Sequence, residues 1–218
     1  MPSPIFEFPD PETDDPDGIV GVGANLSVGT LMSAYQSGIF PWPIEGMPLP
    51  WFCPPRRALL KKSDLHISRS LAKWIKKTTL TVTVDQAFEQ VIGYCARVPR
   101  PGQPGTWITP AMKKAYIALH QAGHAHSVEV WNEKKLVGGI YGVDPGGAFS
   151  AESMFHLETN ASKLALLHLL DHLEDRGVGW LDIQMLTPHL KALGAKEISR
   201  NRFLALLKKA LTEARRLF

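Results

Sequence analysis

The spacing of apolar and polar residues along the 218-residue chain predicts a mixture of helices and short strands. Gly follows several of the helical stretches, and a Ser, Thr or Asn stands at the start of five, which is the usual capping pattern: Ser27, Thr109, Asn160, Thr187 and Ser199. Between them, short runs rich in β-branched and aromatic residues predict strands. Helices are expected over residues 28–37, 66–77, 85–96, 110–123, 161–176 and 188–194 and from 199 onward, and strands over 81–84, 126–131, 136–143, 148–155 and 180–184.

Two proline-rich stretches interrupt this pattern, and residues 1–18 are expected to be irregular. Residues 39–43 and 50–55 combine proline with bulky aromatic side chains. Because proline lacks the N–H of a ladder hydrogen bond, neither stretch is expected to form a central strand or a helix interior. Their aromatic rings either line a pocket or seal a small core.

The order of the expected elements predicts the fold class. A strand and two helices come first, followed by three meandering strands, a helix, a strand and a helix. This order predicts an α+β fold whose sheet has an antiparallel half and one crossover. The same order is found in the acyltransferase sheet known as the GNAT fold, and such a likeness concerns the fold alone.

Charge is distributed unevenly along the chain. Residues 1–55 contain seven acidic side chains and no Lys or Arg, so the remaining chain carries all 24 basic residues against 14 acidic ones. An excess of this kind favours a polyanionic partner, because Lys and Arg can contact phosphates and release counterions. A role in solubility alone is the alternative.

The helix expected over residues 66–77 concentrates this charge on one face. Its apolar residues follow the helical repeat, and its basic residues repeat the same spacing about 200° away. No acidic residue interrupts the basic face, which favours a nucleic-acid surface over a merely solvated one. Four more basic residues, Arg56, Arg57, Lys61 and Lys62, lie just upstream. We call the four residues of the helix face the basic stripe: Arg69, Lys73, Lys76 and Lys77.

Other bulk features narrow the class of protein. No run of about 18 apolar residues is present, and the N-terminus lacks a basic segment followed by an apolar one. The two cysteines, Cys53 and Cys95, lack metal-ligand spacing and are expected to be reduced thiols. We therefore expect a cytoplasmic protein without membrane association.

Two expected strands carry acidic or amide side chains among apolar neighbours. Glu152 follows Ala151 near the end of one strand, where it forms either a structural ion pair or an anionic pocket for a cationic group. Asp182 and Gln184 lie two residues apart on another, so they should share a face at a separation of about 6–7 Å. Buried polar side chains need partners or hold a ligand.

The sequence also offers an aromatic site and lacks several familiar ones. Trp107 precedes a helix start, where an indole either stacks on a base or fills the core. The loop over residues 156–159 has no glycine, unlike a loop that cradles the pyrophosphate of acetyl-CoA. His124 and His126 could share a strand face, but no third zinc ligand is evident, which favours a structural role.

Seven stretches together closely resemble the leucyl/phenylalanyl-tRNA–protein transferases of bacteria. They occur in order from about residue 19 to 205, and their combination is highly specific. The matching stretches are AYQSGIFPW at 34–42, LHISRS at 65–70, GTWIT at 105–109, GHAHSVEVW at 123–131, ESMF at 152–155, NASK at 160–163 and DIQ at 182–184.

The resemblance implies a GNAT-like domain over residues 61–218 behind a small N-terminal domain over residues 1–60, with no metal and no CoA. It implies that Leu, Phe or Met is moved from aminoacyl-tRNA to proteins beginning with Arg or Lys, which marks them for degradation by the N-end rule. A monomer is expected. The basic stripe inherits the contact with the tRNA acceptor stem, and Trp51 and Trp107 hold the aminoacyl-adenosine end. The slot for the Leu or Phe side chain maps onto Ile140, Met154, Leu169, Leu173 and Leu181.

The resemblance also suggests roles for the polar residues. Glu152 is expected near the α-amino group of the aminoacyl ester, and Asp182 is expected to orient Gln184. Because a neutral amide is a poor base, Gln184 is expected to orient the amine and stabilise the oxyanion. The chain departs from the family in its two slot leucines, its loop over residues 97–104 and its end at Phe218.

Overall fold

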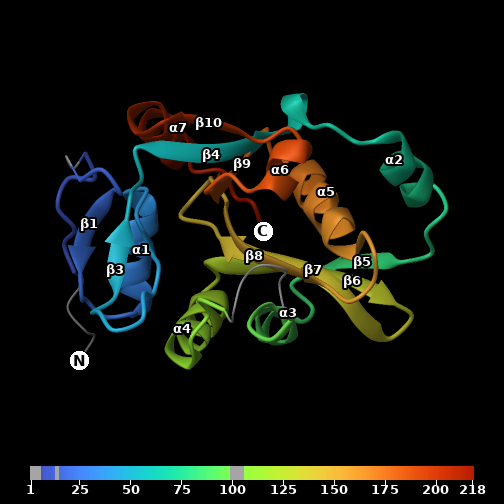
Figure 1. Cartoon of the computed structure of the whole chain (residues 1–218), viewed down its shortest axis with the longest axis horizontal. Helices are drawn as coiled ribbons and strands as arrows, with labels where there is room; N and C mark the ends of the chain where they lie inside the picture. Colours follow the sequence, from blue (N-terminus) through green and yellow to red (C-terminus); the bar gives the residue numbers. More distant parts are fainter. Residues whose placement is uncertain (1–5, 13–14, 99–105) are drawn as a thin grey trace.

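Two sheets organise the chain in the computed structural model, which describes residues 6–12, 15–98 and 106–218 (Figure 1). The small sheet has the strand order β1-β3-β2, and the large sheet has the order β10-β4-β9-β8-β7-β6-β5. The small sheet contains β1 (Ile19–Val22), β2 (Phe40–Pro41) and β3 (Pro50–Phe52), and the large sheet contains β4 (Arg56–Lys61), β5 (Thr81–Val84), β6 (Ala125–Asn132), β7 (Lys135–Val143), β8 (Ser150–His156), β9 (Trp180–Gln184) and β10 (Lys196–Ser199).

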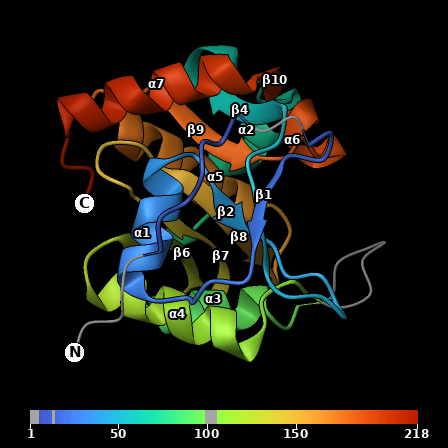
Figure 2. The same ribbon diagram turned by 90° about the vertical axis from the view of Figure 1, so that its left-hand side faces the viewer.

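Helices cover both faces of the large sheet. Helices α3 and α4 pack on one face, where they contact β6, β7 and β8, and α5 packs on the other (Figure 1). In the view of Figure 2, α7 crosses above the sheet while α3 and α4 lie below it. The helices are α1 (Val28–Gln36), α2 (Arg69–Ile75), α3 (Phe88–Cys95), α4 (Pro110–Gln121), α5 (Ala161–Glu174), α6 (Pro188–Ala192) and α7 (Arg200–Glu213), with a 3₁₀ turn η1 (Lys62–Asp64).

The large sheet is antiparallel except where α5 crosses over between β8 and β9, the one parallel pair among its described strands. This arrangement confirms the predicted α+β acyltransferase-type sheet, in which an antiparallel half is followed by one crossover. The predicted caps at Ser27, Thr109, Thr187 and Ser199 are also confirmed, because each side chain accepts a hydrogen bond from a backbone N–H in the first turn.

Several local predictions were wrong. Residues 50–55 were expected to contain no central strand, yet β3 lies in the middle of the small sheet. The strand is only three residues long and places its proline at the first position, where sheets tolerate it. Strands β4 and β10 were missed, because short segments with Arg or Lys at their ends do not show an apolar run.

The helix of the basic stripe is shorter than expected. It begins at Arg69 behind a Ser68 cap, so Ile67 lies outside it and is 39% exposed. Leu71 is buried and Trp74 is half-buried, as the predicted apolar face requires. Asn160 does precede α5, but its φ of 66° places it in the left-handed region, and its side chain makes no capping bond.

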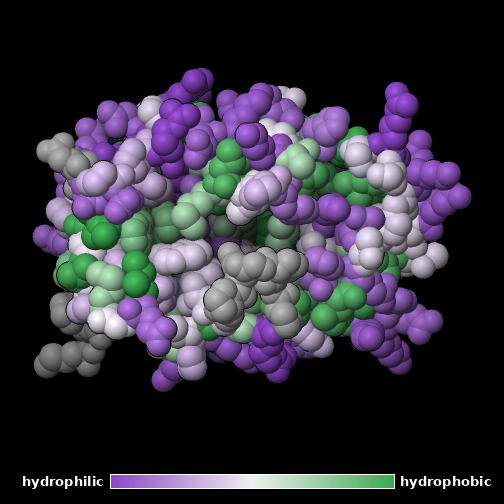
Figure 3. Space-filling model, in the orientation of Figure 1, coloured by the Kyte–Doolittle hydropathy of each residue, from purple (hydrophilic) through white to green (hydrophobic). Residues whose placement is uncertain are grey.

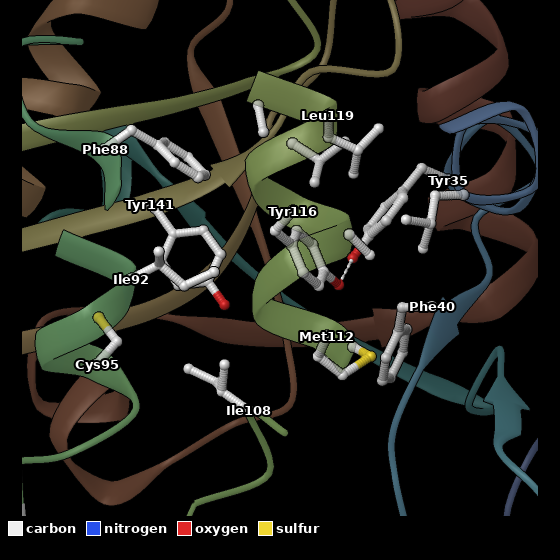
Figure 4. Close-up of a cluster of buried hydrophobic side chains, with 14 of the residues drawn as sticks. Tyr35, Phe40, Phe88, Ile92, Cys95, Ile108, Met112, Tyr116, Leu119 and Tyr141 are labelled. Atoms are coloured by element: carbon white, nitrogen blue, oxygen red, sulfur yellow. Dashed lines mark hydrogen bonds between the residues drawn. The ribbon is translucent and has the colours of Figure 1, made fainter. Parts of the chain in front are cut away.

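The N-terminal segment packs directly against the helices of the large sheet. Leu31 and Tyr35 of α1 belong to the same buried cluster as Val91 of α3 and Tyr116 of α4. Figure 4 shows Tyr35 and Tyr116 pointing toward one another across this cluster. The predicted boundary at residue 60 falls inside β4, which belongs to the large sheet, and the division into two domains stays a prediction.

Candidate active site

A cavity of about 590 Å³ opens where β8 and β9 separate. The two strands are paired at Ser150 and Asp182, and beyond this pair the sheet is open between them. Side chains from β8, the first turn of α5, the end of β9 and α6 line the cavity, together with Trp42 and Trp107. The face seen in Figure 3 is hollowed near its centre, in the same region.

Glu152 of β8 is the one acidic residue that lines the cavity, as far as the structure describes it. Its carboxylate accepts hydrogen bonds from the Tyr35 hydroxyl (2.7 Å), the Tyr116 hydroxyl (3.2 Å) and the Gln184 side-chain amide (2.7 Å). No cation among the described residues forms an ion pair with it. Burial is the largest cause that raises the pKa of Glu152, to about 7, and the tyrosine hydroxyls oppose the shift.

The two tyrosines form a buried clamp around this carboxyl group. Their hydroxyl oxygens are 2.5 Å apart, and both rings are almost fully buried in the cluster of Figure 4. Burial, followed by the nearby Glu152, raises the pKa of Tyr35 and of Tyr116 well above the ordinary value. Both tyrosines therefore stay neutral and act as donors. Neither tyrosine was predicted from the sequence to have a role in the site.

Asp182 is 1% exposed and does not line the cavity. Arg57 of β4 binds it with two parallel hydrogen bonds, from Nε to Oδ1 (2.8 Å) and from Nη2 to Oδ2 (2.6 Å). The Ser150 hydroxyl adds a bond to Oδ2 (2.8 Å), and the backbone N–H of Gln184 adds one to Oδ1 (3.0 Å). Four donors, two of them on the Arg57 guanidinium, thus satisfy this buried carboxylate without contact to solvent.

Arg57 therefore corrects one prediction made from the sequence. It was grouped with the basic residues upstream of the stripe, but its side chain is 1% exposed. The guanidinium also donates to the Gly38 carbonyl (3.2 Å) and lies over the rings of Phe40 and Phe203, 4.8 Å and 4.4 Å from their centroids. An arginine in a short apolar segment, two residues before Leu59, was the available signal for burial.

Gln184 takes a left-handed conformation, with φ at 60°, at the end of β9. A residue other than glycine is uncommon in this backbone conformation and is held there by its surroundings. For Gln184, the backbone N–H donates a hydrogen bond to Asp182. Its side chain reaches the cavity, where one amide N–H is used by Glu152. The other amide N–H and the amide oxygen can bind a reacting group. The Asp182 carboxylate thus contacts Gln184 at its backbone N–H and, because it is buried, does not reach the cavity.

Two tryptophans stack at the cavity wall. The rings of Trp42 and Trp107 are 5.2 Å apart at an angle of 22°, and both line the cavity. Trp51 was predicted as the partner of Trp107, but it is 0% exposed and lies outside the cavity lining. Its indole N–H donates to the Gly23 carbonyl, and its ring packs on Phe8. Trp42, and not Trp51, is therefore the tryptophan that lies beside Trp107 at the cavity.

Comparison with known proteins identifies the family. The sequence model of the family described as leucyl/phenylalanyl-tRNA protein transferase matches residues 59–208, and the family model of its N-terminal domain matches residues 24–55. A leucyl/phenylalanyl-tRNA–protein transferase of Maridesulfovibrio salexigens is 50% identical over 94% of this chain and 85% of its own length. Its counterpart from Pseudoalteromonas atlantica is 48% identical over 94% and 88%.

The chain belongs to this family. It is accordingly an aminoacyltransferase enzyme whose substrates are an aminoacyl-tRNA and a protein. Among solved structures, a ribosomal-protein-alanine N-acetyltransferase from Brucella melitensis biovar Abortus 2308 is 17% identical with a TM-score of 0.37, covering 51% of this chain and 82% of its own. L-PGS from Bacillus licheniformis is 12% identical with a TM-score of 0.41, covering 71% and 51%.

The predicted side-chain slot of the transferase is only partly exposed to the cavity. Ile140 and Met154 line it, on adjacent strands and in register with each other. Leu169 and Leu173 of α5 and Leu181 of β9 are buried in the core and lie outside the cavity lining. The two helix residues lie one and two turns beyond Leu166, the residue of α5 that does line the cavity. Leu166 and Ile183 line the cavity instead, although the sequence analysis did not select them. The helix spacing of three between Leu166 and Leu169 was the available signal.

The basic stripe is exposed at the end of the molecule opposite the small sheet (Figure 1). Within the described parts of the chain, none of its four cations forms an ion pair. Two of the upstream cations differ, because Arg56 is paired with Glu197, and Lys62 with Asp171 and Glu174. Arg57 is buried against Asp182, so among the described residues the stripe and Lys61 keep the unpaired positive charge that was predicted for this region.

His126 and His172 have structural contacts. His126 bonds to Asp85 through Nδ1 (2.7 Å) and stacks on Phe218, which also stacks on His172. No group of three or more His, Cys, Asp or Glu side chains in the described segments could hold a metal ion.

Both cysteines are free and buried. Nor does any helix of those segments have the length and hydrophobicity to cross a membrane. The predicted loop over residues 97–104 lies almost wholly outside the described residues.

Proposed function

We propose that this transferase moves Leu or Phe, and also Met, from aminoacyl-tRNA to the N-terminal Arg or Lys of acceptor proteins in the cytoplasm, as a monomer. The added residue would mark the acceptor for degradation by the N-end rule. The observation that carries the proposal is the cavity itself, which combines an apolar wall with one carboxyl group and one amide. A slot of this kind suits an apolar side chain next to an amine.

The apolar wall would bind the side chain of the transferred residue. Ile140, Met154, Leu166 and Ile183 line the cavity, with Leu169, Leu173 and Leu181 packed behind them. These side chains are unbranched or aliphatic and have no polar atom besides a thioether, so they favour Leu, Phe or Met over polar residues. Glu152 would bind the α-ammonium group of the aminoacyl ester.

The terminal adenosine would bind near the tryptophans. Trp42 and Trp107 both line the cavity, and an aromatic ring can bind a base by stacking. Trp51 has no accessible surface for this role. The basic stripe would contact the phosphates of the acceptor stem.

The reaction needs little chemical assistance, because the ester of aminoacyl-tRNA is already activated. The neutral α-amine of the acceptor attacks the ester carbonyl, and the carbonyl oxygen gains a negative charge. Collapse forms the new amide and releases the ribose hydroxyl, which takes up the proton lost by the amine. Gln184 has an amide oxygen for the attacking N–H and a second N–H for the oxyanion. Positioning of the two substrates supplies most of the remaining acceleration.

Asp182 would act indirectly in this scheme. Its carboxylate is buried, with Arg57 and Ser150 on one side and the Gln184 backbone on the other. It would therefore hold Gln184 in its left-handed conformation, so that the side chain stays in the cavity. We class Asp182 as a positioning residue and keep Glu152 and Gln184 as the groups in contact with substrate.

A transfer assay tests the proposal. The enzyme is incubated with radiolabelled Leu-tRNA and two peptides that differ only in an N-terminal Arg or Ser. We expect label to enter the Arg peptide, and Gln184→Ala to lower the rate by about 10²–10³, the usual cost of losing an oxyanion donor. Transfer by Gln184→Ala near the wild-type rate would contradict the assigned role. Binding of acetyl-CoA in a calorimeter would favour a small-molecule acetyltransferase, and tRNA binding without transfer a non-catalytic module.

A further inference from the structure

The cavity has a second polar region, at the end away from Glu152. Three basic or imidazole side chains line it there: His156 at the end of β8, Lys163 in the first turn of α5 and His189 in α6. The mechanism above uses none of them. No acidic residue lines this end, because Glu152 is the one carboxylate in the described lining.

The two polar regions are separated along one strand. Glu152 and His156 are four residues apart on β8, which corresponds to about 13 Å at the rise of a strand. The cavity is thus acidic near one end and cationic at the other, with apolar and aromatic side chains between them. A matching ligand has an ammonium group at one end and an anion at the other.

The three side chains line the same cavity and influence one another electrostatically. Both Lys163 and His156 lower the pKa of His189, after the larger effect of its partial burial. The Lys163 ammonium donates to the Asn160 side chain (3.0 Å), which fixes its direction while leaving two N–H donors. His156 Nδ1 is 3.5 Å from the Ser162 hydroxyl, so its other ring nitrogen can face a ligand. Lys163 has no carboxylate partner among the described residues.

Resting on the proposed function, we infer that His156, Lys163 and His189 form a phosphate-binding site for the nucleotide that carries the amino acid. In an aminoacyl-nucleotide, the 5′-phosphate lies across the ribose from the aminoacyl ester. With the ammonium at Glu152 and the base on the tryptophans, this phosphate faces the three side chains. A lysine with two imidazoles can provide charge-assisted hydrogen bonds to its oxygens.

The site differs from the basic stripe in what it recognises. The stripe is exposed on α2 and on the two residues that follow it, and it fits any nearby phosphates of a long nucleic acid. The cavity site fixes one phosphate relative to the ester carbon, and so determines where the carbonyl lies with respect to Gln184. Removal of the site is therefore expected to impair binding of even the smallest phosphorylated substrate analogue.

Calorimetry with two stable analogues tests the inference. The ligands are 3′-leucylamino-3′-deoxyadenosine, in which an amide replaces the ester, and the same compound with a 5′-phosphate. We expect the wild-type enzyme to bind the phosphorylated analogue at least about tenfold more tightly, as for a hydrogen bond between charged groups. Lys163→Met should remove most of this preference, and Lys163→Arg should retain it.

A neighbouring lysine provides the control. Lys191 is an exposed residue of α6 and does not line the cavity. Lys191→Met should keep the preference for the phosphorylated analogue, and thermal unfolding should show that each variant is folded. His189→Gln retains a neutral N–H donor and leaves the Lys163 ammonium in place, so a smaller loss is expected than for Lys163→Met.

The outcomes separate the phosphate site from the proposed function. If the wild-type enzyme binds both analogues equally, the phosphate site is wrong although the transferase proposal stands. If neither analogue binds, the proposed function itself is at fault. If acetyl-CoA displaces the phosphorylated analogue and Lys163→Met prevents this, the side chains bind the diphosphate of CoA, and the inference is overturned.

Discussion

Replacing Arg57 with methionine tests the link between the buried ion pair and the active site. The change removes both hydrogen bonds to Asp182, the bond to the Gly38 carbonyl and the contacts with two aromatic rings. Asp182 then keeps only the Ser150 hydroxyl and the Gln184 N–H. Removal of one partner from a buried ion pair costs about 3–5 kcal/mol, because the remaining charge is uncompensated.

This cost is a large part of the total free energy of unfolding, which is about 5–15 kcal/mol for most domains. Urea unfolding would measure it, with the transfer assay run on the fraction that stays folded. Arg56→Met is the matched control, because Arg56 is the adjacent residue, its side chain is 63% exposed and its contact with Glu197 is 3.7 Å. We expect the control to lose less than about 1 kcal/mol.

A double-mutant cycle isolates the ion pair from the other contacts of Arg57. The variant that combines Arg57→Met with Asp182→Asn has no uncompensated charge, so it should be more stable than the sum of the two single changes implies. We expect a coupling free energy of about 2 kcal/mol or more. Costs that add to within about 0.5 kcal/mol would refute the reasoning, because they would show that the two side chains do not stabilise each other.

Three further predictions concern the cavity and the basic stripe. Burial raises the pKa of Glu152 from 4.5 to about 7, so between these pH values the folded protein binds more protons than the unfolded one. The free energy of unfolding should therefore fall as pH rises through this window, by at most about 3 kcal/mol. Urea titrations at pH 5 and 8 measure this fall, and Glu152→Gln should make it smaller. Trp42→Ala should weaken binding of the unphosphorylated leucyl analogue about tenfold or more in calorimetry, as for lost base stacking, whereas equal affinity would exclude Trp42 from the nucleoside site. Neutralising all four residues of the basic stripe should reduce tRNA affinity and the steepness of its salt dependence, and an unchanged salt slope in filter binding would assign tRNA contact to another surface.

The sequence was most informative where a local pattern determines the structure. The helix caps at Ser27 and Thr109 follow from side-chain chemistry within three residues, and the hairpin of β6 and β7 follows from alternation. Strand β9 was predicted with its observed boundaries. The order of the remaining elements in the large sheet could be inferred, because the two missed strands, β4 and β10, lie together at one edge of the sheet, next to β9.

The contacts that organise the site were harder to infer, because they join distant parts of the chain. Arg57 and Asp182 are 125 residues apart, and nothing in either segment indicates that they meet. The Tyr35 and Glu152 pair likewise depends on how α1 packs against α4 and β8. Trp51 and Trp42 occur in similar proline-rich stretches, and only burial distinguishes the one in the core from the one at the cavity.

The hydroxyl of Tyr35 gives the N-terminal segment a direct influence on the acidity of the site. Because α1 supplies one of the groups that lower the pKa of Glu152 and also excludes water from it, loosening of this helix would hydrate the carboxyl group. Solvation would outweigh the lost hydrogen bond, and the proton affinity of Glu152 would fall toward that of a free glutamate. The ionisation of a single side chain thus reports whether α1 is docked.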